Sequence, residues 1–307
     1  MFLNSPVLRF TGTNPHGQCT IGMSESADVI FEKMAAAAQP APAPAVNMPE
    51  ESSSILIPIV LILGLAALIA LFFYKRAIHE FRINQVESLE EGLAQQHERV
   101  PCVISECMGP TGLWTAETVR SRAPLATYAV DGMWPLTRFL TTELNLPEIG
   151  EDDGTALAET AGVALWATHT VLPVFKSATT FGSLYRAAVY TYAGPRGLHK
   201  TTAATSLLIA TDGALSVSIM HEQAEPYMPA DWHGRHLSTF TYDDTPLLGH
   251  IDYMDIILRP GNALLLPAHW TYCVAGHEGA VPLYTLIEFH HPVSAFVNRV
   301  LAVRGLK

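Results

Sequence analysis

The pattern of hydrophobic and polar positions changes most sharply at residues 55–74. These twenty residues, ILIPIVLILGLAALIALFFY, contain no charged side chain. As a helix they would reach about 30 Å, the thickness of the hydrocarbon core of a bilayer. A buried core helix would normally carry a polar face, and a secretory signal peptide would be shorter and nearer the start of the chain. We therefore expect a transmembrane helix from Ile55 to Tyr74.

The residues that flank this run predict its orientation. Tyr74, Lys75 and Arg76 end or follow it as interfacial anchors, whereas two glutamates precede it. Because positively charged residues stay on the cytoplasmic side, the C-terminal part is expected to face the cytosol or a matrix-like compartment. Residues 1–54 would form an extended segment across the membrane, with the Ala/Pro-rich stretch QPAPAPAVNMPEESSS as a linker.

After the apolar run, residues 75–99 show a pattern typical of an amphipathic helix. The segment has no proline and one glycine, and Pro101 follows it. We expect a helical stalk that continues the transmembrane helix and ends near Pro101. Its apolar stripe consists of Ile78, Phe81, Val86, Leu89 and Leu93.

From residue 100 onward the chain consists of short runs rich in β-branched and aromatic residues, separated by glycine and proline. Such spacing is typical of an antiparallel β-sandwich or barrel. Helices are expected around residues 132–144 and 155–169, so residues 100–307 are predicted to form an α+β domain with a helical N-terminal portion. The runs expected as strands are PCVIS, LYRAAVYTYAG, TSLLIATDG, ALSVSIM, MDIILRPG, NALLLPAHWTYCVAG and PLYTLIEFHHP.

Composition narrows the classes of partner. The 307 residues are 49% hydrophobic and only 15% charged, and their formal net charge is −11. An acidic balance argues against nucleic acid as a partner, because phosphate binding needs a basic patch. The four cysteines form no CxxC pair, which favours a reducing compartment over a disulfide scaffold.

Several motifs in residues 100–307 resemble the JmjC, or cupin-like, branch of the double-stranded β-helix (jelly-roll) proteins. The opening RVPCVI at 99–104, YTYAGP at 190–195 and LLI at 207–209 follow the order of that family. The most specific similarity is LRPGNALLLPAHW at 258–270. The resemblance implies a jelly-roll fold over about 200 residues. The family is best known for iron- and 2-oxoglutarate-dependent hydroxylases and demethylases.

In that family an H-x-D/E pair and a distal histidine hold Fe(II). Here the first position is His199, but the second falls on Thr201 and the distal position on Tyr272. No lysine lies between Thr201 and Leu258 to pair with the far carboxylate of 2-oxoglutarate. The resemblance thus implies a degenerate metal site, with no catalytic residue, no metal and no cofactor.

These observations favour a non-catalytic pseudoenzyme. We expect a membrane-anchored structural or accessory subunit of a large membrane-associated assembly, in which the cupin-like domain is an interaction module. Its expected partners are the lipid bilayer and other protein subunits, in an organellar inner membrane such as that of the mitochondrion, or in the membrane of a large virus particle. Two alternatives remain open. One is a membrane-tethered oxygenase with an atypical metal site around His199, and the other is a metal-free ligand-binding cupin in which Tyr192, Trp270 and Tyr272 line the pocket.

Overall fold

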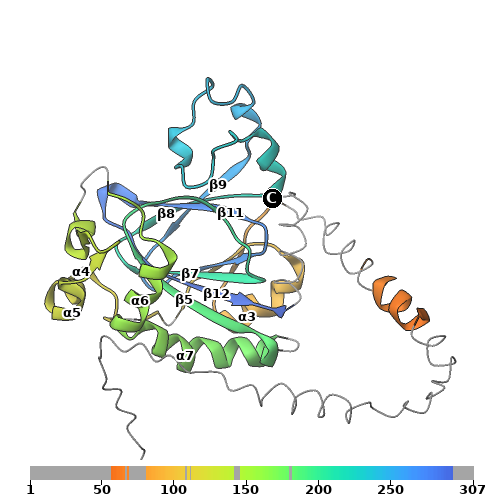
Figure 1. Cartoon of the computed structure of the whole chain (residues 1–307), viewed down its shortest axis with the longest axis horizontal. Coiled ribbons are helices and arrows are strands. Elements are labelled where there is room, and N and C mark those ends of the chain that lie inside the picture. The colour runs from red at the N-terminus through yellow and green to blue at the C-terminus, as the bar shows by residue number, and fades with distance from the viewer. Residues whose placement is uncertain are drawn as a thin grey trace, which may run out of the picture. The chain divides into compact units, whose positions relative to one another are not determined.

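The structure is a computed structural model of the whole chain (Figure 1). It describes residues 57–65, 68, 81–107, 109–110, 112–141, 146–179 and 182–292. The chain divides into two compact units, Met1–Ala67 and Leu68–Lys307.

In the first unit, residues 57–65 are helical and their side chains are exposed. The other residues expected in the transmembrane helix, apart from Leu68, lie outside the described residues, as do residues 1–54 and the anchors Tyr74, Lys75 and Arg76. Within the part of the chain that the structure describes, no helix has both the length and the apolar character needed to span a bilayer. The transmembrane helix at residues 55–74 stays a prediction.

The second unit is built on two large β-sheets (Figure 1). Each run that we expected to be extended contains at least one strand. Strands β5 to β12 distribute between the sheets as in a jelly roll, and their pairing is antiparallel. The six-stranded sheet has the order β1 (Asn84–Val86), β2 (Cys102–Ile104), β10 (Ala263–Pro267), β7 (Thr205–Asp212), β12 (Leu283–His290) and β5 (Arg186–Ala193). The four-stranded sheet has the order β6 (Arg196–Lys200), β11 (Thr271–Gly276), β8 (Leu215–Met220) and β9 (Tyr253–Leu258).

The main core lies between the two sheets, because alternate residues of their strands point to the same side. Leu215, Val217 and Ile219 of β8 are fully buried and belong to one cluster with Leu208 of β7 and Leu286 of β12.

Helices cover the outer face of the six-stranded sheet (Figure 1). Helices α6 (Glu151–Ala161) and α7 (Val163–Ala178) meet at Gly162, whose φ of 83° ends the first helix. Phe175 of α7 stacks on Phe289 of β12 with ring centroids 3.7 Å apart. The other helical pieces are α4 (Ala116–Ser121), α5 (Ala123–Ala126), η3 (Gly182–Leu184) and η7 (His277–Gly279).

The prediction of a helix over residues 132–144 is wrong for the described part of that range, residues 132–141. Strand β4 (Trp134–Pro135) pairs with β3 (Ala129–Val130), and the 3-10 helix η2 (Leu136–Leu140) follows. Proline cannot donate the hydrogen bond that an interior helical position requires. The hairpin is also closed by the amide of Leu136, which donates to the carbonyl of Tyr128.

The prediction of a continuous helical stalk over residues 75–99 is also wrong for its described part, residues 81–99. That part contains β1, the short helix α3 (Leu89–Ala94) and the 3-10 helix η1 (Gln95–Glu98). Strand β1 pairs in parallel with β2, and Val86 and Leu93 are buried on the sheet. Tertiary pairing has overridden the helical periodicity, so the fold begins before residue 100.

A long connection between β8 and β9 forms a lobe beside the four-stranded sheet (Figure 1). It contains three 3-10 helices and its own small apolar cluster, which includes Met228, Phe240 and Ile251. The three 3-10 helices of the lobe are η4 (Glu222–Tyr227), η5 (Leu237–Thr239) and η6 (Leu248–His250).

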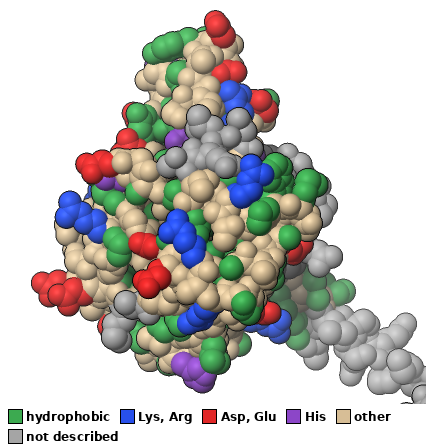
Figure 2. Space-filling view, turned by 90° about the vertical axis from the view of Figure 1, so that its left-hand side faces the viewer, with side chains coloured by type: hydrophobic (Ala, Val, Ile, Leu, Met, Phe, Trp, Pro, Cys, Tyr) green, Lys and Arg blue, Asp and Glu red, His purple; other side chains and the backbone are tan. Residues whose placement is uncertain are grey.

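On the face of the molecule shown in Figure 2, acidic and basic side chains are interspersed.

Candidate functional site

A cavity of about 380 Å³ lies beside strand β6. Its walls come from β5, β6, β11 and β12, from the segment that leads into α6, and from the lobe between β8 and β9. Ligand-binding pockets commonly span about 300–1,000 Å³, so this cavity suits a small molecule. Its ionisable lining residues are Glu148, Glu151, Tyr190, Arg196, His199, Lys200, His233, Tyr272, Glu288 and His290.

His199 lies in this cavity opposite Tyr272, its register partner across β6 and β11. Its Nδ1 atom is 2.9 Å from the carbonyl oxygen of Gly197. Because a carbonyl only accepts, Nδ1 carries the hydrogen and Nε2 presents a lone pair. Burial, together with the charge of Arg196, lowers the pKa of His199 to about 4, so the ring is neutral at pH 7.

Arg196 lies on the same strand and is only 6% exposed. Its guanidinium carbon is 4.3 Å from the centroid of the Tyr192 ring. Its Nη2 atom is 3.9 Å from an oxygen of Glu151, whose side chain is 69% exposed. Among the residues that the structure describes, neither Nε nor Nη1 of Arg196 has a hydrogen-bond partner. Both atoms are themselves buried, so the cavity contains a buried cation whose charge is incompletely paired.

Thr201 is not among the residues that line the cavity. Strand β6 ends at Lys200, and the Thr201 hydroxyl lies 2.8 Å from the carbonyl oxygen of Pro267 and accepts from the amide of Trp270 at 3.0 Å. It thereby holds the turn between β10 and β11, where His269 has a φ of 70°. The family resemblance would place the carboxylate of an iron site at Thr201, and the hydroxyl of this residue is instead hydrogen-bonded to the backbone of the turn.

Two aromatic residues expected to line the pocket lie elsewhere. Tyr192 is buried behind Arg196, and Trp270 is buried between Phe81 and His221. Tyr272 lines the cavity, whereas neither Tyr192 nor Trp270 is part of its wall. Both side chains pack in the core, where large aromatic side chains stabilise the fold by burying apolar surface.

Sequence reasoning also missed several residues of this cavity. Arg196 lies three positions before His199, whereas the search for a cation covered only the residues after it. Glu148 and Glu151 come from a segment almost fifty residues earlier and carry no recognisable motif. A sequence rule that tests both sides of His199 along its strand would have found Arg196, but the glutamates become visible only in the fold.

The remaining histidines do not assemble a metal site within the described residues. The rings of His233 and His199 are 4.7 Å apart, and Glu148 lies 3.8 Å from Nε2 of His199. Nevertheless, no group of three or more His, Cys, Asp or Glu side chains in the described part of the chain is placed to hold a metal ion.

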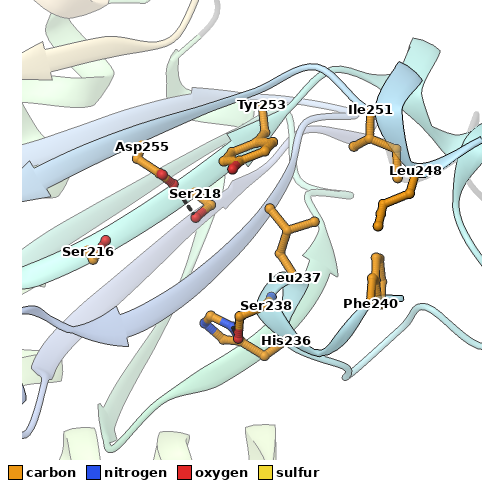
Figure 3. Close-up of a pocket in the computed structure, with 10 residues that line it drawn as sticks. All are labelled: Ser216, Ser218, His236, Leu237, Ser238, Phe240, Leu248, Ile251, Tyr253 and Asp255. Atoms are coloured by element: carbon orange, nitrogen blue, oxygen red, sulfur yellow. Dashed lines mark hydrogen bonds between the residues drawn. The ribbon is translucent and has the colours of Figure 1, made fainter. Parts of the chain in front are cut away.

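A second cavity of about 380 Å³ lies between the four-stranded sheet and the lobe (Figure 3). At one end Ser218 donates to Asp255, and at the other Phe240, Leu248 and Ile251 form an apolar wall. His236 accepts from the amide of Ser238 and so begins η5. Most of the polar groups in this cavity thus have a structural partner.

Comparisons with known proteins add little beyond this architecture. No protein-family model matches the chain, and no curated protein matches its sequence. Solved structures similar to it include the non-heme alpha ketoglutarate dependent carbocyclase SnoK from nogalamycin biosynthesis, with 10% identity over 33% of this chain and 47% of SnoK and a TM-score of 0.24. Vicilin from Solanum melongena shows 12% identity over 34% of this chain and 24% of vicilin, with a TM-score of 0.22. A cupin superfamily protein from Desulfitobacterium hafniense shows 14% identity over 34% of this chain and 67% of that protein, with a TM-score of 0.21.

The alignments thus cover less than half of SnoK and about a quarter of vicilin. Similarity at this level carries no argument about function. The strand order of the two sheets defines the class of the domain, which is a cupin-like jelly roll.

Proposed function

We propose that this chain is a non-catalytic protein whose cupin-like domain works without a metal. The observation that carries the proposal is the position of Arg196. Its buried positive charge lies close enough to His199 to help lower the pKa of that ring, and the same charge would repel a divalent cation bound there. The hydroxyl of Thr201 is engaged by a turn, and Tyr272 stands where the family has its distal histidine.

The proposal extends to the rest of the chain on sequence grounds. The apolar run at residues 55–74 would anchor the domain in a membrane, and the domain would act as an accessory or structural module for other subunits of a membrane-associated assembly. The membrane of an organelle or of a large virus particle would suit such a protein. The uncharged run and the basic residues after it support this part.

Metal analysis and turnover test the non-catalytic part of the proposal. The purified full chain would be incubated with Fe(II) and 2-oxoglutarate without oxygen, desalted and measured for bound iron, and a second sample would be assayed for succinate in air. We expect fewer than about 0.1 iron atoms per chain and no succinate above the background without protein. Stoichiometric iron that is lost in His199→Ala, or succinate formation that depends on His199, would refute the proposal in favour of the oxygenase alternative.

Extraction from native membranes tests the anchor. The full chain is expected to stay in the membrane fraction after washing with alkaline carbonate and to be released by detergent. A variant that lacks residues 55–74 is expected to be released by the carbonate wash. Release of the full chain by carbonate would contradict a spanning anchor. Proteins that co-purify with the detergent-extracted chain, but not with a chain that lacks the cupin-like domain, would identify its partners.

A further inference from the structure

The cavity beside β6 contains groups of opposite charge that the protein itself leaves incompletely paired. The side chain of Arg196 is 7% exposed, whereas those of Glu148 and Glu151 are 36% and 69% exposed. We infer that this cavity binds a small zwitterion, whose carboxylate pairs with Arg196 and whose ammonium group is held by Glu148 and His199. The inference rests on the proposed function, because it takes the cavity to be free of metal.

Arg196 defines the carboxylate end of the ligand. Its Nε and Nη1 atoms have no hydrogen-bond partner among the described residues, and its Nη2 is 3.9 Å from Glu151, beyond hydrogen-bond distance. Nε and Nη1 are themselves buried, so a carboxylate in the cavity would meet the guanidinium at its Nη2 side. Burial raises the pKa of Tyr272 to about 12, so its hydroxyl stays protonated as a further donor in the same cavity.

His199 and Glu148 define the ammonium end. His199 Nε2, which presents a lone pair, lies 3.8 Å from Oε2 of Glu148. Two acceptors at this distance repel each other unless a donor lies between them. The imidazole cannot supply that proton itself at pH 7, because burial and Arg196 keep the pKa of His199 at about 4. An ammonium group offers three donors to both acceptors, and the carboxylate of the same ligand, paired with Arg196, offsets the charge that would repel a bare cation there.

The other cations of the cavity wall are already paired. Lys200 Nζ lies 2.6 Å from Glu225 and 3.5 Å from Glu222. His290 Nε2 lies 3.2 Å from Glu288. Within the described residues, the buried Arg196 is therefore the cation left for an anionic group, while Glu148 and Glu151 keep negative charge near the solvent side. This distribution favours a ligand with both charges over a simple anion, which the glutamates would repel.

A titration series with matched charges tests the inference on the full chain in detergent. Isothermal titration would compare two zwitterions, L-norvaline and 5-aminopentanoate, with pentanoate and pentylamine, which each carry one of the two charges. We expect at least one zwitterion to bind about tenfold or more tightly than either singly charged compound. In Arg196→Met its dissociation constant should rise about 30-fold or more, because a buried charge pair is lost.

Control variants make the result specific. Arg259→Met removes the same charge from an exposed turn far along the chain from β6 and should leave the affinity unchanged. Glu148→Gln should weaken the zwitterion but not pentanoate, because only the ammonium group loses its counter-charge. If Arg196→Met does not fold, as judged by circular dichroism, Arg196→Lys and Glu148→Gln decide the question, since the lysine keeps the charge but not the paired donors.

Three outcomes would overturn the inference. The first is equal affinity for pentanoate and the zwitterions. The second is an affinity that does not change in Arg196→Met or, if that variant does not fold, in Arg196→Lys. The third is no heat from any of the four compounds up to about 10 mM. The proposed function fails by a different result, namely stoichiometric iron or succinate formation. The two failures are therefore distinguishable in the same preparation.

Discussion

The protonation of His199 should make the folded domain sensitive to acid. Its pKa is about 4 in the folded protein and near ~6.5 in an unfolded chain. Between these values the unfolded state binds more protons than the folded state, so the free energy of unfolding falls as the pH is lowered through this window. Integration from about pH 7 to about pH 4.5 gives a loss of about 2 kcal/mol from this one ring.

Replacement of the ring by a neutral amide isolates this contribution. Urea unfolding of the full chain and of His199→Asn would be followed at both pH values by the fluorescence of the tryptophans, of which Trp114 and Trp270 are buried. The loss of unfolding free energy on acidification should be about 2 kcal/mol smaller in the variant. His169→Asn, which removes an exposed histidine on α7, should show the same loss as the parent chain.

Equal acid losses in the parent chain and in His199→Asn would refute this reasoning. That result would mean that His199 is as easily protonated in the fold as in water, and hence that it is neither buried nor influenced by Arg196. The environment assigned to the cavity would then be wrong.

Three further substitutions test the packing around the site and the core, each by urea unfolding at neutral pH. Gly197→Ala should destabilise the domain by about 2 kcal/mol or more, because the added carbon would overlap the carbonyl of Gly234; an unchanged midpoint would contradict this contact. Thr201→Val should cost about 1–3 kcal/mol by leaving buried backbone groups unpaired, whereas Thr202→Val should cost less. Phe175→Ala should cost about 3–5 kcal/mol by opening a cavity against the sheet, and a loss below ~1 kcal/mol would show that α7 packs loosely.

The strands of the sandwich were predictable because their signal is local. A run such as LSVSIM alternates buried and half-buried residues over its first five positions, and no distant contact is needed to recognise it. The helix expected through residues 81–99 failed for the opposite reason. Asn84–Val86 became a strand because Cys102–Ile104 offers it a parallel partner, which no local pattern reveals.

The candidate site was predictable only in part. The positions of His199 and Tyr272 followed from the family resemblance, and the register of β6 and β11 places them opposite each other. Trp270 was misplaced because strand periodicity does not continue through the turn that precedes β11, where His269 has a left-handed backbone. Arg196 and Glu148 lie far apart in the sequence, and the fold brings them to one cavity.

Strand β6 forms one edge of the four-stranded sheet, yet its backbone is not open on that side. The amide of Leu198 donates to the carbonyl of Arg235, and the amide of Gly234 donates to the carbonyl of Leu198. An uncovered edge strand can pair with another chain, and covering it is a recognised protection against such pairing. Strand β6, which carries Arg196 and His199, is therefore shielded from edge-to-edge assembly with another copy of the protein.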